Sequence, residues 1–203
     1  MTTTIIDLGV GNLGNVVRAV EHVGGTAEVT ADPKAIAGSR RLILPGVGAF
    51  SPPREALRGE IEQALRAALA EGAWLLGICV GFQLLFESSE EFGTTDGLSL
   101  LPGRIVRLPD GVPLPHIGWN RLQDLAPHPL LAGLPPEPWV YFVHSFAPEG
   151  ADEVTLARTT HGRRFTSVAA RGRVLGCQFH PERSGPTGLK ILANFLALAE
   201  GAA

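Results

Sequence analysis

The sequence predicts an α/β fold: a single domain with a mixed, mostly parallel central sheet and flanking helices. Short apolar runs alternate with segments of helical periodicity over residues 5–90, which is typical of parallel strands joined by helices. Beyond residue 98, short β-branched runs follow one another at spacings that suit antiparallel hairpins. No repeat or linker interrupts residues 1–203, so we expect one domain, although this length also allows two small ones.

The expected elements follow the hydrophobic pattern. In the first half, apolar β-branched runs predict strands, and apolar residues three or four positions apart predict helices. In the second half, short strands prevail, with a turn at Arg171-Gly172-Arg173 and an amphipathic helix at the end. The expected strands cover residues 5–8, 27–30, 41–44, 74–78, 104–107, 140–143, 154–157, 168–170 and 174–179, and the expected helices cover residues 16–23, 53–70, 81–88 and 189–199.

Composition and charge exclude several classes of protein. With 45% hydrophobic and 18% charged residues, the chain can bury a sizeable core, which argues against general disorder. A formal net charge of −3 argues against a nucleic-acid-binding protein, which usually carries a basic surplus. We expect no secretory leader and no membrane span, and the two cysteines are too few for a disulfide framework. The expected location is therefore the cytoplasm.

Glycines near the N-terminus match a nucleotide-binding pattern. Gly9-Val10-Gly11-Asn12-Leu13-Gly14 fits G-x-G-x-x-G between an expected strand and an expected helix, and Asp32 lies near the end of the next strand. A nicotinamide or flavin site is therefore one alternative. A tight strand-to-helix turn favours glycine for steric reasons alone. The other interpretation is a close loop from which Asn12 and Asn15 present their amides to a neighbour.

Gly77-Ile78-Cys79-Val80-Gly81 is the strongest local signal for chemistry. It ends an apolar strand and begins a helix, and small residues two positions before and after Cys79 permit a sharp, crowded turn. This is the pattern of a nucleophile elbow with sulfur in place of oxygen. A helix N-terminus behind the sulfur favours the thiolate, and the N–H of Val80 points where an oxyanion would form. The alternative is a buried core cysteine.

A thiolate nucleophile needs a base and a group that orients the base. His180 ends an apolar strand and is followed by Pro181 and Glu182, so the rigid proline holds the imidazole and the carboxylate in set directions. A carboxylate two residues away can bond the imidazole N–H and set its tautomer. Pro45-Gly46-Val47-Gly48, which also follows a strand, is a candidate for a second oxyanion donor. We interpret Cys177 as a core residue.

Together these motifs resemble those of the class I (triad) glutamine amidotransferases. Residues 77–83 are similar to the nucleophile elbow of that family, and His180-Pro181-Glu182 is similar to its His-Pro-Glu motif. The resemblance covers nearly the whole chain. Within the family, the pattern is most similar to the glutaminase subunits of imidazole glycerol phosphate synthase. The finer matches are residues 7–15, Pro45-Gly46-Val47-Gly48, His116-Ile117-Gly118-Trp119-Asn120 and Tyr141-Phe142-Val143-His144-Ser145.

The resemblance implies that Cys79 attacks the side-chain amide of L-glutamine, that His180 manages the protons and that Glu182 orients His180. Ammonia would pass to a (β/α)8-barrel synthase (cyclase) subunit of a heterodimer, which makes imidazole glycerol phosphate and aminoimidazole carboxamide ribonucleotide in histidine biosynthesis. No cofactor and no metal is implied. The implied oxyanion donors are the N–H groups of Val47 and Val80, and the implied substrate contacts are Gly46, Gly48, Gln83, His144, Ser145 and Phe146.

The chain departs from the family pattern at two of these places. Arg183 follows Glu182 where lysine is common, and Phe146 stands where tyrosine is common, which puts a hydroxyl contact there in doubt. We expect the partner to dock over the crevice at the carboxyl ends of the strands, on Asn12, Asn15, Trp119 and Arg183, because ammonia must not escape. The alternative is that Trp119 is a core residue and Arg183 pairs within its own chain.

Other functions remain open at this point. The chain could serve another ammonia-using synthase, such as pyridoxal phosphate synthase, but those glutaminases usually carry a Gly-Gly-Glu-Ser/Thr loop where this chain has Pro-Gly-Val-Gly. A stand-alone thiol hydrolase would use the same triad without a partner. A non-catalytic binding module would have no reason to retain Cys79, His180 and Glu182 together.

Overall fold

The computed structural model describes residues 2–200 and is built around a seven-stranded sheet. Five of its strands are parallel, and the last two join the edge as antiparallel neighbours. The expectation of a mixed, mostly parallel sheet is therefore confirmed. The strand order is β11 (Thr155–His161), β12 (Arg163–Arg171), β13 (Val174–Cys177), β4 (Trp74–Cys79), β3 (Arg41–Gly46), β1 (Thr2–Ile6) and β2 (Thr26–Thr30).

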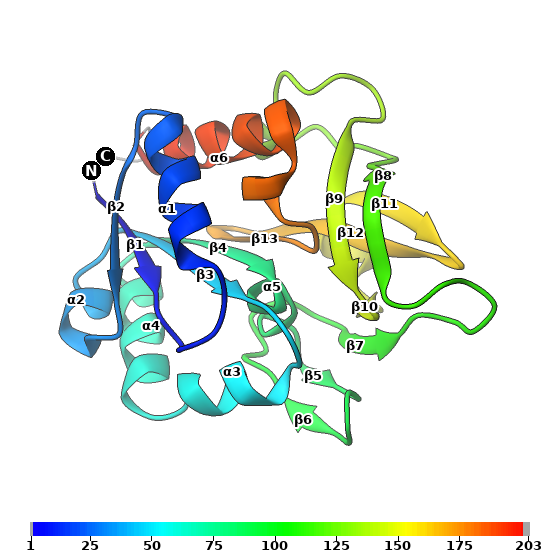
Figure 1. Ribbon diagram of the computed structural model, residues 1–203. Coiled ribbons are helices and arrows are strands. Elements are labelled where there is room, and N and C mark those ends of the chain that lie inside the picture. The colour runs from blue at the N-terminus through cyan, green and yellow to red at the C-terminus, as the bar shows by residue number, and fades with distance from the viewer. Residues whose placement is uncertain (1, 201–203) are drawn as a thin grey trace.

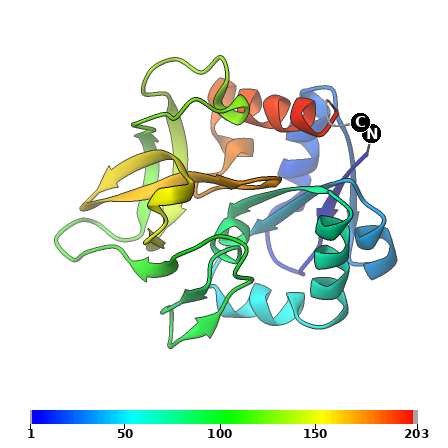
Figure 2. The ribbon, with the colours of Figure 1, turned by 180° about the vertical axis from the view of Figure 1, so that it is seen from behind.

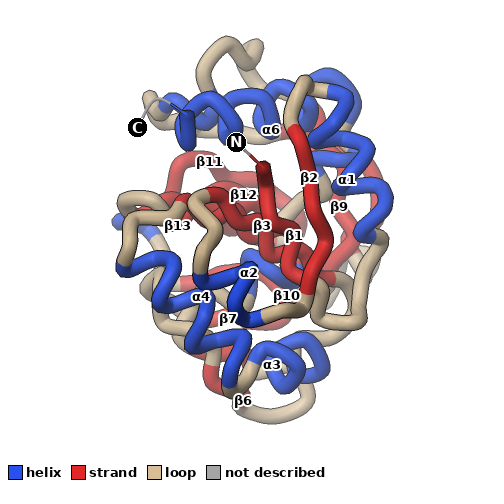
Figure 3. Tube along the Cα trace, turned by 90° about the vertical axis from the view of Figure 1, so that its left-hand side faces the viewer, coloured by secondary structure: helices blue, strands red, loops and turns tan. Residues whose placement is uncertain are grey.

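Helices cover both faces of this sheet, as expected of parallel strands joined by helices (Figures 1 and 3). Two helices lie on one face and three on the other, so most of the apolar core lies between the sheet and these two layers. The first layer is α1 (Leu13–His22) and α6 (Gly185–Glu200), and the second is α2 (Pro33–Ala37), α3 (Ser51–Leu57) and α4 (Glu60–Ala70).

The central strands β3 and β4 are apolar on both faces because both faces are covered. Every residue of β3 is buried, and β4 is buried from Leu75 to its end. These strands therefore read as continuous apolar runs without the alternation of a half-exposed strand. After β1, Asn12 caps the start of α1, and its side chain accepts a hydrogen bond from the N–H of Asn15.

Two expected helices differ from the prediction. The helix expected over residues 53–70 is two helices, because Gly59 has φ +80° and breaks the hydrogen-bond ladder between α3 and α4. The helix expected over residues 81–88 is a single turn, α5 (Val80–Gln83). After that turn the chain folds back, with the N–H of Leu98 donating to the carbonyl of Leu84. The apolar residues after Gln83 are thus buried by a compact loop, although their spacing suits a helix.

The second half of the chain contains the expected antiparallel hairpin, with its turn at Arg171-Gly172-Arg173 between β12 and β13. Strand ends differ: β13 stops at Cys177 rather than at Phe179, and the strand expected over residues 154–157 extends to His161. A four-stranded sheet and a two-stranded ribbon were not fully predicted. The four-stranded sheet consists of β10 (Phe146–Glu149), β7 (Arg104–Arg107), β5 (Ser88–Ser89) and β6 (Thr95–Asp96). The ribbon consists of β8 (His116–Arg121) and β9 (Trp139–His144). Three short 3-10 turns cover Pro129–Leu131, Asp152–Val154 and Pro181–Arg183.

The arrangement brings distant segments of the chain to one edge of the large sheet. The carboxyl ends of β3 and β4 lie there side by side, with Gly46 opposite Cys79. The ribbon of β8 and β9 stands beside this edge (Figures 1 and 2), and the N–H of His180 donates to the carbonyl of Tyr141 on β9. Within residues 2–200 we find no helix with the length and apolarity needed to cross a membrane.

Candidate functional site

Cys79 occupies a sharp turn between β4 and α5. Its backbone has φ 54° and ψ −111°, a conformation that a residue with a side chain rarely adopts and that typically costs about 1–3 kcal/mol. The flanking glycines are required by space. A Cβ on Gly77 would lie 2.7 Å from Cα of Phe82, and one on Gly81 would overlap the carbonyl oxygen of Leu44. The sharp, crowded turn expected from the sequence is present.

The sulfur of Cys79 is almost completely buried and lies among polar groups. The thiol faces the carbonyl of Val143 on β9 at 3.9 Å, and the side-chain N–H of Gln178 points to the sulfur at 3.9 Å. Gln178 itself is fully buried, just beyond the end of β13. Sequence reasoning missed Gln178; its position two residues before His180 was the only available signal.

His180 and Glu182 form a buried pair. The Nδ1 atom of His180 lies 2.8 Å from Oε1 of Glu182, as the rigid His-Pro-Glu sequence predicts. Two donors fix the carbonyl of His180, because the N–H of Arg183 and the hydroxyl of Ser184 both donate to it. Among residues 2–200, the Nε2 atom of His180 and the Oε2 atom of Glu182 are buried without a hydrogen-bond partner.

The surroundings of His180 favour its protonated form. Burial lowers the pKa of the imidazole, but the sulfur of Cys79 and the carboxylate of Glu182 outweigh burial and raise the pKa to about 10. At neutral pH both nitrogens of the ring therefore carry a proton. Its unpaired Nε2 can give this proton to a reacting group, while Glu182 holds the other nitrogen.

A cavity of about 250 Å³ opens at the sulfur, and we call it the thiol pocket. Glu91, which sequence reasoning missed, contributes a carboxylate to its wall. One oxygen of this carboxylate accepts the N–H of Phe50 at 2.8 Å, and burial raises the pKa of Glu91. Nothing in the sequence pattern distinguished Glu91 from its neighbour Glu90. The pocket is lined by Val47, Gly48, Cys79, Glu91, Val143, His144, Ser145 and His180, among others.

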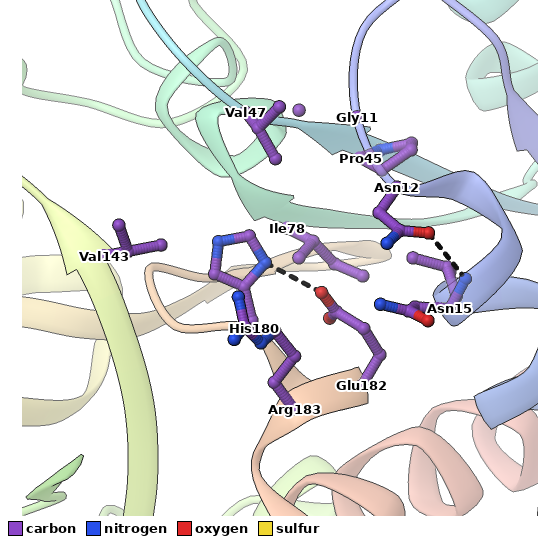
Figure 4. A pocket seen from close by; sticks show the side chains of 12 residues that line it. Gly11, Asn12, Asn15, Pro45, Val47, Ile78, Val143, His180, Glu182 and Arg183 are labelled. Carbon is purple, nitrogen blue, oxygen red and sulfur yellow. Dashed lines mark hydrogen bonds and ion pairs between the residues drawn. The ribbon is translucent and has the colours of Figure 1, made fainter. Parts of the chain in front are cut away.

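A second cavity of about 260 Å³ is also lined by His180, and we call it the edge pocket (Figure 4). Asn12 and Asn15 reach it from the start of α1, opposite Glu182 and Arg183. The glycine motif near the N-terminus thus borders this cavity, while Asp32 caps α2 by accepting the N–H of Lys34. The two pockets share Val47, Val143 and His180, so the two cavities adjoin at these residues.

The remaining predicted substrate contacts lie around the sulfur in different ways. Gln83 is buried, and its side-chain N–H groups donate to the carbonyl of Phe146 at 2.9 Å and to Oε1 of Gln178 at 3.1 Å. His144 and Ser145 line the thiol pocket. Gly46 packs against the elbow, since a Cβ there would lie 2.8 Å from the N atom of Gly81. Val80 is the first residue of α5, directly after the sulfur.

Trp119 and Arg183 lie at the outer surface of the site. Trp119 is 52% exposed and packs edge-on against the ring of Tyr141, so the alternative that it is a core residue is wrong. The guanidinium of Arg183 lies over the ring of Tyr141, 4.4 Å from its centre. Together the three side chains form a surface that adjoins the edge pocket.

Comparison with known proteins agrees with this geometry. The family model of class-I glutamine amidotransferases matches residues 4–199. The chain is 51% identical over 193 residues to the imidazole glycerol phosphate synthase subunit HisH of Symbiobacterium thermophilum, covering 94% of this chain and 91% of that protein. It is 46% identical over 198 residues to the subunit of the same name from Methanosarcina barkeri, covering 95% and 96%.

Solved structures share the fold at low sequence identity. A crystal structure of a glutamine amidotransferase superposes with a TM-score of 0.77 at 22% identity, over 98% of this chain and 99% of that chain. The structure of PurLQS from Thermotoga maritima gives a TM-score of 0.75 at 19% identity, over 97% and 98%. The chain therefore belongs to the class-I glutamine amidotransferase family, in the group of the imidazole glycerol phosphate synthase HisH subunits.

Proposed function

We propose that this chain hydrolyses L-glutamine to glutamate and ammonia with Cys79, His180 and Glu182, and supplies the ammonia to a synthase subunit in histidine biosynthesis. The observation that carries the proposal is the buried Cys79 in a strained elbow beside the His180–Glu182 pair. The identity of 43–51% to HisH subunits over most of the chain supports the pathway. The two free cysteines support a reaction in the reducing cytoplasm.

The first half-reaction releases ammonia. The Cys79 thiolate attacks the side-chain carbonyl carbon of glutamine, and a carbon–sulfur bond forms as the carbonyl electrons move to oxygen. The protonated Nε2 of His180 gives its proton to the amide nitrogen, the carbon–nitrogen bond breaks, and ammonia leaves a thioester. His180 is suited to this step because its pKa, raised to about 10, keeps it protonated at neutral pH.

The second half-reaction restores the enzyme. His180, now neutral at Nε2, takes a proton from water, and the hydroxide adds to the thioester carbon. The carbon–sulfur bond then breaks and glutamate leaves, with Cys79 again as the thiolate. In both half-reactions the negative oxygen would be stabilised by the N–H groups of Val80 and Val47, which lie at the ends of the two neighbouring strands β4 and β3.

Glutamine recognition follows from the walls of the thiol pocket. We assign Glu91 to the α-ammonium group of glutamine, because its carboxylate is the negative charge that lines this pocket besides the triad. Ser145, His144 and Gly48 line the same cavity and would contact the rest of the substrate. Gln83 and Phe146 contribute indirectly, since the Gln83 amide is engaged by the Phe146 carbonyl and by Gln178.

The partner in this proposal is a (β/α)8-barrel synthase subunit that docks over the edge pocket. Asn12 and Asn15 line one side of this pocket and Arg183 the other, and Trp119 lies next to Arg183 around Tyr141. Because the thiol pocket and the edge pocket share Val47, Val143 and His180, ammonia released at Cys79 can pass from the first cavity to the second. A partner seated there would receive it.

The test is a glutaminase assay of the chain with and without the barrel subunit of the synthase. We expect glutamate and ammonia in equal amounts from glutamine, and imidazole glycerol phosphate only when the barrel subunit and its nucleotide substrate are present. Cleavage of peptides without glutamine hydrolysis would favour the stand-alone thiol hydrolase instead. Activation by a pyridoxal phosphate synthase subunit, but not by the histidine-pathway barrel, would reassign the partner.

A further inference from the structure

The amide of Gln178 lies between the nucleophile and a chain of buried polar side chains. Its nitrogen donates toward the sulfur of Cys79 at 3.9 Å, and its oxygen accepts an N–H of Gln83 at 3.1 Å. A glutamine amide can be turned by 180° at little cost unless its neighbours distinguish oxygen from nitrogen. Only one of the two orientations presents a donor to the sulfur. The neighbours of Gln178 therefore determine whether its nitrogen or its oxygen faces Cys79.

Gln83 selects that orientation. One N–H of Gln83 donates to the carbonyl of Phe146 at 2.9 Å, and a backbone carbonyl can only accept. The nitrogen end of Gln83 is thereby assigned without ambiguity. The same nitrogen donates its second hydrogen to Gln178, so the side-chain oxygen of Gln178 must be the acceptor. The nitrogen of Gln178 then faces Cys79.

Two histidines hold the other side of the Phe146 carbonyl. The Nδ1–H of His144 donates to this carbonyl at 2.8 Å, and its Nε2 lies 3.0 Å from Nδ1 of His116. Since the carbonyl requires a hydrogen on Nδ1 of His144, the neutral ring has its lone pair on Nε2. His116 must therefore donate from Nδ1 and keep its own lone pair on Nε2.

Asn120 on β8 completes the chain and agrees with this assignment. Its oxygen accepts the N–H of Arg121 at 2.8 Å, and its nitrogen donates to the carbonyl of Thr160 at 3.1 Å. The same nitrogen donates to Nε2 of His116 at 3.2 Å. Backbone groups at both ends thus impose the same tautomer on both rings. Every hydrogen bond from Asn120 to Cys79 has one permitted set of donors and acceptors.

Both rings are suited to remain neutral in this chain. Burial lowers the pKa of His144 to about 3 and that of His116 to about 4, and His161 stacks on His116 with ring centres 4.0 Å apart. The three rings do not form a metal site: among residues 2–200 no group of three histidine, cysteine or acidic side chains is placed to hold an ion. The two rings therefore carry no charge at neutral pH.

We propose that Gln178 is a positioning residue for the Cys79 thiolate, and that Gln83 and the Phe146 carbonyl hold its amide in the donating orientation, while His144, His116 and Asn120 continue the hydrogen-bonded chain behind that carbonyl. This inference rests on the proposed role of Cys79 as the nucleophile. An N–H directed at the sulfur stabilises the thiolate more than the thiol, because hydrogen bonds to charged acceptors are the stronger ones. The chain starts at Asn120, next to the exposed Trp119, so it connects the outer surface of the ribbon with the nucleophile.

The experiment measures the rate of alkylation of Cys79 by iodoacetamide against pH, which reports the thiolate without glutamine turnover. It is done in a Cys177→Ser background, so that Cys79 is the only thiol of the chain. Gln178→Met keeps the length of the side chain and removes the N–H. We expect the pH midpoint of alkylation to rise by about one unit, as the loss of one charge-assisted hydrogen bond predicts. The other titratable groups near the sulfur, which are His180, Glu182, Glu91 and His144, remain in place.

Two further variants test the orientation of the Gln178 amide. Gln83→Met frees the Gln178 amide to turn, so it should raise the midpoint by less than Gln178→Met does. Gln178→Glu replaces the donor by a carboxyl group of the same shape and should raise the midpoint more. Gln123→Met is the matched control, because this half-buried glutamine accepts from the Thr160 hydroxyl and does not contact the sulfur. Its midpoint should equal that of the background chain.

A spectroscopic measurement tests the rest of the chain. Nitrogen-15 chemical shifts of the histidine rings at pH 7 should show the Nδ1–H tautomer for both His116 and His144. Asn120→Asp offers an acceptor to Nε2 of His116 while His144 still accepts from Nδ1, so both nitrogens of His116 should carry hydrogen in this variant. Nε2–H tautomers in the parent chain would overturn the assigned hydrogen-bond directions.

The outcomes separate this inference from the proposed function. An unchanged alkylation midpoint in Gln178→Met, or in Gln178→Glu should the first variant not fold by circular dichroism, overturns the role of Gln178 even if the chain is a glutaminase. Conversely, glutamine hydrolysis that persists in Cys79→Ala overturns the proposed function, while the alkylation data still report on Gln178 and the sulfur.

Discussion

The Nδ1 atom of His180 lies 2.8 Å from Oε1 of Glu182, and both side chains are only 5% exposed. A buried carboxylate next to a buried imidazole stabilises the imidazolium, and the sulfur of Cys79 acts in the same direction. This relationship makes His180 an acid that is available at neutral pH, and it also makes folding stability depend on pH.

Stability should fall with rising pH through the titration of His180. Its pKa is raised from 6.5 to about 10, so the contribution is fully present below pH 6.5 and is lost as the pH approaches 10. We expect the free energy of unfolding of the parent to decrease over this window by up to a few kcal/mol relative to His180→Asn. Urea unfolding of both chains from pH 6 to pH 10 measures the difference. A constant difference across the window would contradict the raised pKa.

Removal of the nucleophile should abolish glutamine hydrolysis without loss of the fold. Cys79→Ala relieves a strained backbone position only slightly and leaves no group to form the thioester, so activity should fall by at least about 10⁴-fold. With the barrel subunit, synthesis from added ammonium salts should persist. Cys177→Ala is the control, because Cys177 is buried and donates to the carbonyl of Phe179 away from the pocket. It should retain most of the activity.

Glu91→Gln should raise the KM for glutamine by about 10- to 100-fold, since a charge-assisted hydrogen bond to the α-ammonium group is lost. The kcat should change much less, because Glu91 lies on the pocket wall and not at the reacting carbon. Glu90→Gln is the matched control: this neighbouring carboxylate accepts the N–H of Arg107 outside the pocket. Equal KM values for both variants would remove Glu91 from substrate recognition.

The isolated chain should be a poor glutaminase that the partner activates. Val47 is 39% exposed and Gly48 has φ +84°, so the loop after β3 can rearrange when a partner covers it. If the Val47 N–H reaches the oxyanion only in the complex, glutamine hydrolysis should rise by about 10²- to 10³-fold with the barrel subunit and its nucleotide ligand. A coupled assay for glutamate measures both states. Full activity of the isolated chain would rule out this gating.

Substitutions at the outer surface should weaken the complex. Trp119→Ala and Arg183→Ala each remove one side of the cluster around Tyr141, and exposed tryptophan and arginine are the residues most often responsible for binding energy. Each variant should raise the Kd for the barrel subunit and increase the glutamine consumed per product formed. Trp139→Ala serves as control, because Trp139 is 50% exposed on the same ribbon but packs with Arg121 and makes no ring contact with Tyr141. Normal binding by both test variants would place the docking face elsewhere.

The chemistry of the site was largely predictable from local sequence. Gly77 and Gly81 around Cys79 signal an elbow because the turn leaves no room for a Cβ, and Pro181 places His180 and Glu182 at hydrogen-bond distance. Both constraints act within five residues, so they appear as contiguous motifs. The mostly parallel character of the central sheet was also predictable, since apolar runs mark strands that are buried on both faces.

The sequence by itself thus determined the fold class, the elbow and the His-Pro-Glu pair, whereas only the tertiary structure decided what surrounds the sulfur. Gln178, Glu91 and His116 come from three separate segments, and no spacing along the chain relates them to Cys79. The length of α5 also depended on context, because residues after Gln83 pack as a loop although their apolar spacing suits a helix. Local motifs report constraints between neighbouring residues, while a buried hydrogen-bonded chain exists only after distant strands have packed together.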